Sequence, residues 1–221
     1  MNEDPGYADG TNAGSGAPST AARRGTRRRY GRNGRRLWLA CGGVVVVAAA
    51  AVTGILKFGF RPDDDPPAHA FAIPARIGTY VRAPDLEHEA SLTALPDEIT
   101  GTSAGQASHV VSAVYESGNP AAGGTTQIFM FIGGHLADAD PASSIASLTR
   151  SYSGAIMVSA GSLGGKAACA EEQAGTSDSV SLCAWFDDDS FGELVSPTMN
   201  ASALSHEMLT VRPAVERVVT K

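Results

Sequence analysis

A serine-centred motif is the part of this 221-residue sequence whose spacing comes nearest to a catalytic element. Gly101-Thr102-Ser103-Ala104-Gly105 matches G-x-S-x-G, in which a serine at a sharp strand-to-helix turn attacks an acyl carbon. Asp138 or Asp140 and His206 follow in the chain order that such hydrolases use. However, a loop is expected before Ser103 and a strand after it, and 25 glycines make chance matches common. We therefore assign no catalytic residue. Ser103 would be the nucleophile if the protein were a hydrolase, which we keep as the alternative function.

Other patterns that could bind a phosphate or a metal ion fail on ligand type or spacing. Gly164-Gly165-Lys166 lacks the first glycine and the Ser/Thr of a phosphate-binding loop. The run Asp187–Asp189 begins like a calcium loop, but Phe191 and Thr198 occupy positions five and twelve, where oxygen ligands are needed. The five histidines do not have the spacing of a metal site. The sequence thus predicts no cofactor and no metal site, and it predicts a polar turn at Asp187–Asp189.

The cysteines give the sharpest local prediction. Cys169 and Cys183 lie on either side of a turn region whose midpoint is residue 176, so antiparallel strands would place them opposite one another. Trp185 would then share the face of Cys183 and pack on the bridge. The pair lacks the C-x-x-C spacing of a redox site and has no nearby zinc ligands. We expect a structural disulfide Cys169–Cys183, which leaves Cys41 unpaired.

Charge is distributed unevenly along the chain. Residues 1–36 carry a net charge of +5, because eight arginines stand against three acidic residues, whereas residues 57–221 carry −11. Between them, Leu37–Leu56 is a run of 20 residues without a charge. At a rise of ~1.5 Å per residue, this run spans a hydrocarbon core of ~30 Å. The sequence predicts a single transmembrane helix at 37–56; the alternative is a cleaved signal segment, whose apolar region is usually shorter.

The flanking charges predict the topology. Because arginines beside a transmembrane helix favour the cytoplasmic side, we expect the amino terminus in the cytoplasm and residues 57–221 outside, in a single-pass protein of the cell membrane. Residues 1–36 have the composition of a disordered tail, and they are expected to lie on anionic lipid rather than on nucleic acid. Residues 57–74, with four prolines, predict an extended stalk, and residues 75–221 an extracytoplasmic domain.

The external domain is expected to have a mixed α+β fold. The order strand–strand–helix occurs twice, at 107–152 and 165–217, which favours an antiparallel sheet with helices over a parallel doubly wound sheet. Asp140 and Pro141 form a typical helix start, and Pro213 is expected to bend or shorten the last helix. The individual expectations are strands at 78–82, 107–116, 125–132, 166–171, 180–186 and 192–195, helices at 84–95, 140–152 and from 202, and a loop at 100–105.

Several short motifs in this domain occur together in a known group of proteins. They are Gly164-Gly165-Lys166 before Cys169, Cys183-Ala184-Trp185 before Asp187 and Gly192, and a last helix that contains Arg212 and Glu216. In this respect the chain resembles uncharacterised single-pass membrane proteins of high-GC actinomycetes, and its 14 arginines against 3 lysines agree with such a genome. The resemblance covers about residues 72–218. It implies an anchored external α+β domain with one disulfide, and it implies no activity.

These observations favour a binding function over a catalytic one. Aromatic residues make up only 6% of the chain, and no set of catalytic residues converges in the sequence. We expect a membrane-anchored extracytoplasmic binding or accessory protein that is not an enzyme. Its expected partners are membrane lipid and an envelope protein, and not nucleic acid. The alternatives are a cell-envelope serine hydrolase that uses Ser103, and signalling through the cytoplasmic tail.

Overall fold

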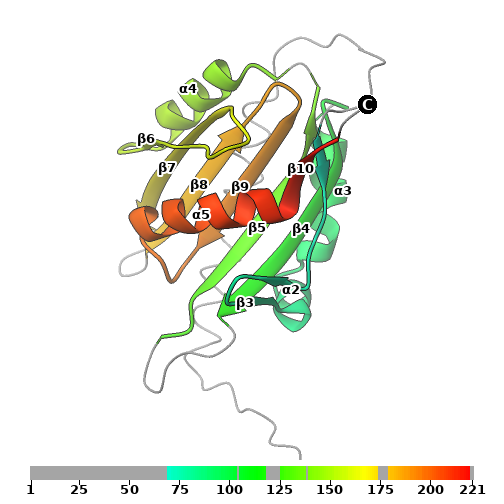
Figure 1. The fold of residues 1–221 in the computed structure, drawn as a ribbon, viewed down its shortest axis with the longest axis vertical. Helices are drawn as coiled ribbons and strands as arrows, with labels where there is room; N and C mark the ends of the chain where they lie inside the picture. Colours follow the sequence, from blue (N-terminus) through cyan, green and yellow to red (C-terminus); the bar gives the residue numbers. More distant parts are fainter. Residues whose placement is uncertain (1–68, 104, 118–124, 138, 174–178, 220–221) are drawn as a thin grey trace, which may run out of the picture. The chain divides into compact units, whose positions relative to one another are not determined.

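The fold is a mixed α+β one, built on a large antiparallel sheet (Figure 1). The computed structural model describes residues 69–103, 105–117, 125–137, 139–173 and 179–219. The chain divides into two units, residues 1–31 and 32–221, and every described residue belongs to the second. The predicted tail, the transmembrane segment 37–56 and Cys41 lie outside the described residues. Within those residues, no helix has both the length and the apolar character that crossing a membrane requires.

Eight of the described strands form the main sheet, and every neighbouring pair is antiparallel. β5 pairs with β9 over Met130–His135, and this pairing joins the two predicted strand–strand–helix segments into one sheet. A separate ladder pairs β1 (His69–Phe71) with β10 (Glu216–Val218), so the C-terminal end of the predicted stalk contains a strand. In spatial order the sheet consists of β2 (Arg76–Ile77), β3 (Tyr80–Arg82), β4 (Ala107–Ser117), β5 (Ile128–Leu136), β9 (Ser190–Ser196), β8 (Ser179–Phe186), β7 (Lys166–Gln173) and β6 (Ile156–Val158).

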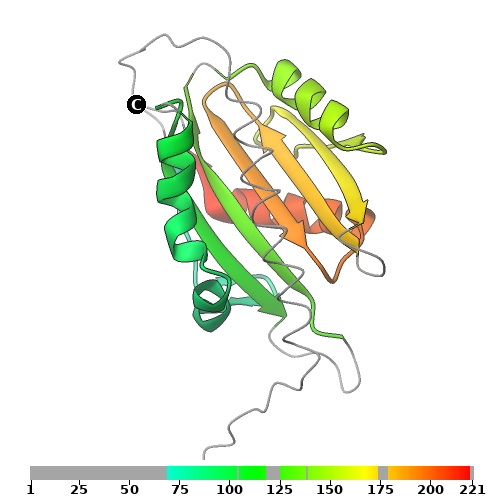
Figure 2. The same ribbon diagram turned by 180° about the vertical axis from the view of Figure 1, so that it is seen from behind.

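Helices lie against both faces of this sheet. α2 (Pro84–Glu89), the 3-10 turn η1 (Leu92–Ala94), α3 (Leu95–Thr102) and α4 (Pro141–Ser151) share one apolar cluster with one face (Figure 2). α5 (Ala201–Val215) crosses the other face (Figure 1). The spacing of four, three and four residues in the last predicted helix predicts one apolar stripe, and the structure buries it fully there: it consists of Leu204, Met208, Val211 and Val215.

The central strand β5 contributes side chains to both clusters. Met130 and Ile132 belong to the cluster with α3 and α4, whereas Phe129 and Phe131 belong to the cluster with α5. All four are buried, because successive side chains of a strand point to opposite faces and both faces are covered. The unbroken apolar run 128–132 is the pattern of a strand that is covered on both faces, and β5 is such a strand.

The start of α4 follows the sequence prediction closely. Asp140 is the N-cap, and its Oδ1 accepts a hydrogen bond from the Ala142 N–H at 3.0 Å. Pro141 occupies the first turn, where its missing N–H has no partner to lose. The helix then ends at Ser151, one residue before the predicted boundary.

The region 84–105 differs from its prediction. The expected helix 84–95 is broken after Glu89, and Ser91 adopts a left-handed φ of 56° before η1. Pro96 does not stop a helix; it lies in the first turn of α3, which continues into the expected loop as far as Thr102. The physical reason is that proline is excluded from helix interiors but fits a first turn. Similarly, α5 continues two residues beyond Pro213.

The two strand–strand–helix segments are not equivalent in space. The first consists of β4, β5 and α4, but the second contains three strands, β7, β8 and β9, before α5. Moreover, α4 and α5 pack on opposite faces of the sheet. The similarity of their element order therefore does not extend to a structural repeat.

Candidate functional site

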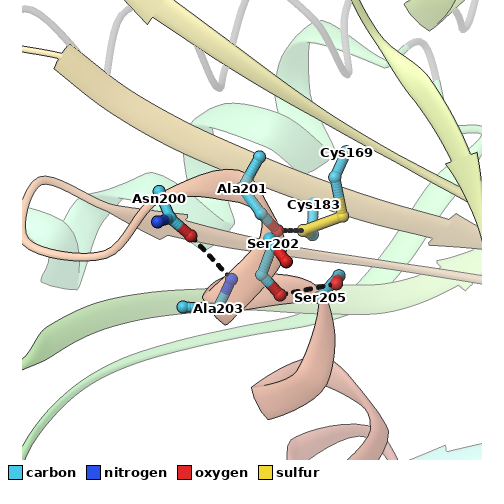
Figure 3. Close-up of a disulfide and its surroundings, with 7 residues drawn as sticks. All are labelled: Cys169, Cys183, Asn200, Ala201, Ser202, Ala203 and Ser205. Atoms are coloured by element: carbon cyan, nitrogen blue, oxygen red, sulfur yellow. Dashed lines mark hydrogen bonds between the residues drawn. A yellow bond between two sulfur atoms is a disulfide. The ribbon is translucent and has the colours of Figure 1, made fainter.

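The predicted cysteine pair lies at disulfide distance near one side of the sheet. Cys169 on β7 and Cys183 on β8 are directly opposite one another, with Cα atoms 4.1 Å apart and an S–S distance of 2.02 Å. Figure 3 shows the start of α5 beside this pair: the Ala201 carbonyl oxygen is 3.9 Å from Cys183 Sγ. The helix is capped there by Asn200, whose Oδ1 accepts from the Ala203 N–H at 2.8 Å. The bridge thus ties β7 to β8 beneath α5.

Ser103 is buried at the end of α3, where its hydroxyl is used for structure. The hydroxyl donates a hydrogen bond to the Thr100 carbonyl at 2.9 Å and accepts one from the Ala107 N–H at 3.1 Å. The residue is only 1% exposed. A helix precedes it and a strand follows it, which reverses the strand–turn–helix order that exposes a nucleophilic serine.

The residues that could complete a serine triad are not brought together. Asp140 caps α4, as described above, and Asp138 lies outside the described residues. His206 is on α5, which packs on the opposite face of the sheet from α3. The structure therefore gives Ser103 none of these partners within the described residues.

A buried ion cluster joins the C-terminal part of α5 to the loops around it. Arg212 is 1% exposed, and its guanidinium donates hydrogen bonds to the carboxylates of Glu216 at 2.8 Å and Asp187 at 3.2 Å. It also donates to the carbonyls of Ala160 at 2.9 Å and Gly164 at 2.6 Å. A buried charge is tolerated only when it is paired and hydrogen-bonded in this way. Arg212 consequently holds the β8–β9 turn, β10 and the loop after β6 in fixed positions.

Glu216 receives hydrogen bonds from three side chains. Besides Arg212, the indole N–H of Trp185 donates to it at 2.8 Å and the Ser190 hydroxyl at 2.7 Å. Trp185 reaches this position across Gly192, where a Cβ atom would lie 2.0 Å from the indole ring. Glycine is needed at that position because any side chain would displace the tryptophan. The buried carboxylate of Glu216 is thus fully compensated.

His69 on β1 completes the cluster, which raises the question of a metal site. Its Nδ1 bonds to Asp189 Oδ1, and its Nε2 is 4.0 Å from both Asp187 Oδ2 and Glu216 Oε1. The last three atoms are close enough to share an ion. However, Arg212 Nη2 is 3.2 Å from the same Asp187 oxygen and 3.5 Å from the same Glu216 oxygen. Because the guanidinium already supplies the positive charge there, we interpret the cluster as a structural salt-bridge network.

Histidines that are far apart in the sequence gather near this network. The rings of His109 and His135 are 5.3 Å apart, and His135 also contacts Phe71 of β1, two residues after His69. His109 has a φ of 49° in an irregular part of β4. Burial, and then the neighbouring His109, lower the pKa of His135, so that its imidazole is neutral at pH 7. Sequence spacing did not indicate this grouping, because strand pairing creates it.

Glu193 is also a buried acid, but unlike Glu216 it lies among apolar residues. It lies on β9 between Ile132 and Ala184, both members of the apolar cluster with α3 and α4. The residue is 3% exposed, and within the described part of the chain its Oε1 has no hydrogen-bond partner. Burial raises the pKa of its carboxyl group to about 8. Glu193 is therefore protonated at neutral pH.

The sheet ends at β6, which is its outermost strand (Figure 1). β6 pairs with β7 on one side, and no other described strand pairs with it on the other. Ile156 and Met157 are 56% and 57% exposed. Leu209 of α5, 41% exposed, adds to this apolar region, because a Cβ atom on Gly161 just after β6 would lie 3.4 Å from its side chain. Exposed apolar edge strands are sites at which another strand can add.

Sequence reasoning located the cysteine pair but missed β6 and the ion cluster. One sequence signal for the edge exists, because residues 151–165 contain no charged residue in a region that is otherwise strongly acidic. No signal of spacing connects His69, Asp187 and Arg212, which are brought together only by the fold. No protein-family model matches the chain, and neither a curated protein nor a solved structure is significantly similar to it.

Proposed function

We propose that this chain is a membrane-anchored extracytoplasmic binding protein without enzymatic activity. Its binding surface is the β6 edge, at which an extended apolar segment of an envelope protein adds to the sheet. The main support is the exposure of Ile156 and Met157 on a strand that has a described neighbour on one side only. As in other cases of strand addition, the main-chain hydrogen bonds between the two strands would provide affinity. The alternating side chains of the added strand would provide specificity.

The edge is held rigidly enough to act as a template. Ile156 is opposite Cys169, which the disulfide ties to β8, so the strand behind the edge is fixed. Arg212 holds the Ala160 carbonyl two residues after β6. Binding to a preorganised edge costs less ordering entropy than binding to a mobile one. The disulfide and the ion cluster thus support the binding surface indirectly.

The polar groups that could perform acyl-transfer chemistry are used inside the domain. The hydroxyl of Ser103 is bonded to the ends of α3 and β4, and Asp140 caps a helix. Exposing Ser103 would break both of its hydrogen bonds. These contacts favour the binding function over the hydrolase alternative.

Anchoring in the cell membrane is supported by the apolar segment 37–56 and by the eight arginines that precede it. The segment crosses the bilayer once, with the amino terminus in the cytoplasm, and the arginine-rich tail lies on anionic lipid. This topology places the described domain outside the cytoplasm, where the Cys169–Cys183 disulfide persists.

Affinity capture of the full chain from native membranes tests the binding surface. The wild type is compared with Met157→Lys and with the control Thr100→Lys, which places the same charge on an exposed position of α3. We expect the envelope protein captured by the wild type and by Thr100→Lys to decrease at least tenfold with Met157→Lys, because a lysine on an edge strand opposes strand addition. Equal capture by all three proteins would contradict the proposal.

A further inference from the structure

The hydrogen-bond pattern of the sheet determines which main-chain groups of β6 point outward. In the β8–β9 turn, the Asp187 N–H donates to the Ser190 carbonyl at 2.8 Å, so this pair is a hydrogen-bonded one. Pairs along an antiparallel ladder alternate between bonded and non-bonded. Cys183 and Leu194 are four positions further along and are therefore a bonded pair. Since Cys183 uses its N–H and C=O toward β9, it forms a non-bonded pair with Cys169, which agrees with their short Cα separation of 4.1 Å.

The same alternation continues to the edge of the sheet. Cys169 has its N–H and C=O directed away from β8, toward β6, where they bond to Ile156. Met157, the next residue, is then a non-bonded neighbour of Ala168. Its N–H and C=O consequently point away from the sheet, on the side where no described strand lies. Met157 thus combines an outward-facing donor and acceptor with a side chain that is 57% exposed.

We propose that the protein which adds to this edge is a second copy of the same chain; this inference rests on the proposed function. The β6 sequence is self-complementary in an antiparallel arrangement about Met157. Ile156 of each copy lies opposite Val158 of the other, and the two Met157 residues lie opposite one another. All of these side chains are apolar, so the pairing leaves no polar side chain of β6 without a partner.

Charge also favours this occupant. Residues 57–221 carry a net charge of −11, so two copies repel one another over most of the domain. The segment 151–165, which contains β6 and the residues on both sides of it, has no charged residue. Two copies can therefore approach through this segment without placing like charges directly opposite one another.

The pairing has a definite geometry. A twofold axis perpendicular to the sheet passes between the two Met157 residues, whose N–H and C=O groups form two reciprocal hydrogen bonds. The N–H of Ser159 faces the Ala155 carbonyl of the other copy and forms two more. The Ala155 N–H is not needed, because it already donates to the Tyr152 carbonyl at 3.2 Å. The result is one continuous sheet with both α5 helices on the same face.

This contact is small compared with the about 1,600 Å² that a standard protein interface buries. Confinement of both copies to one membrane compensates, because it raises their effective concentration without any new contact. We therefore expect the dimer to form when the chain is anchored, and it should be tested with the full chain in native membranes.

Cysteine cross-linking of the full chain in native membranes tests the register. In a Cys41→Ser background, Met157→Cys places two thiols across the twofold axis, at the ~5.5 Å Cα separation of a bonded pair, which a disulfide can bridge. Ser159→Cys is the matched control: Ser159 is exposed directly after β6, but in the paired strands its two copies would be four residues apart, which is ~14 Å at ~3.4 Å per residue. We expect at least tenfold more cross-linked dimer for Met157→Cys after mild oxidation. Equal yields, or no dimer for Met157→Cys, would overturn the second-copy assignment.

A second measurement uses the direction of the Met157 N–H. Two differently tagged full chains are expressed in one membrane, and Met157→Pro removes the outward N–H while leaving the bonds to β7 in place. We expect co-purification of the two tags to decrease at least tenfold with an unchanged melting temperature. Co-purification that is unaffected by Met157→Pro would contradict the pairing. If a different envelope protein is captured through Met157 and no self-association occurs, the proposed function stands and this inference fails; if neither occurs, both fail.

Discussion

The ion cluster around Arg212 and the β6 edge are adjacent, yet their polar groups are in opposite states. In the cluster, Arg212 and Glu216 are buried, and each has several hydrogen-bond partners within the domain. At the edge, the main-chain groups of Met157 face outward beside two exposed apolar side chains. Arg212 connects the two regions through the Ala160 carbonyl. The charges of the cluster are compensated inside the domain, whereas the main-chain groups of Met157 have no described strand beside them.

Removing Arg212 from the ion cluster should have the largest effect on stability. Arg212→Ala leaves the buried carboxylate of Glu216 and the partly buried carboxylate of Asp187 without their counter-charge, and we expect a loss of about 3–5 kcal/mol in the free energy of unfolding. Arg217→Ala, which removes an exposed arginine from β10, is the control and should cost less than about 0.5 kcal/mol. Urea denaturation of the full chain in mild detergent measures both. Equal effects of the two substitutions would show that the cluster is not the source of this stability.

Removing the disulfide should have the next largest effect. The bridge closes a loop with a sequence separation of 14, for which chain entropy predicts a contribution of about 3 kcal/mol. The double variant Cys169→Ala/Cys183→Ala should lower the melting temperature, and reduction of the wild type should lower it by a similar amount. A reductant that leaves the wild-type melting temperature unchanged would refute the bridge.

Glu193 and Glu216 are both buried acids, but they differ in their hydrogen bonds. Glu216 accepts hydrogen bonds from three side chains, whereas Glu193 Oε1 has no described partner. Its folded pKa of about 8 lies above its ordinary value of 4.5, so the folded state retains a proton that the unfolded chain releases in this range. The wild-type free energy of unfolding should therefore decrease as the pH rises from about 4.5 to about 8. Glu193→Gln should remove this slope and be more stable than the wild type at pH 8, because glutamine has no proton to release there. Parallel pH profiles of the two proteins would contradict the assignment.

Substitution at the open edge should change stability least. Because the Met157 side chain is mostly exposed, Met157→Lys should alter the free energy of unfolding by less than about 0.5 kcal/mol. Binding through the edge should nevertheless be lost. A loss of stability comparable to that of Arg212→Ala would show that Met157 is part of the folded core and not a free edge.

The sequence predicted the features that depend on neighbouring residues. The Asp140–Pro141 helix start, the buried stripe of α5 and the opposed cysteines each follow from short-range spacing, and the structure contains all three. The strands β1, β6 and β10 escaped prediction because each has only three residues, too few for a periodic pattern. The convergence of His69, Arg212 and Asp187 could not be inferred, since it depends on the pairing of β1 with β10.

The binding function of the β6 edge is tested most directly by photo-cross-linking in native membranes. The full chain carries p-benzoylphenylalanine in place of Met157, and a control chain carries it in place of the exposed Thr100 of α3. We expect irradiation to join the residue-157 protein to one protein species of defined mass, with no such product from the residue-100 protein. The absence of any product at residue 157, or the same products at both positions, would contradict the assignment of β6 as the binding surface.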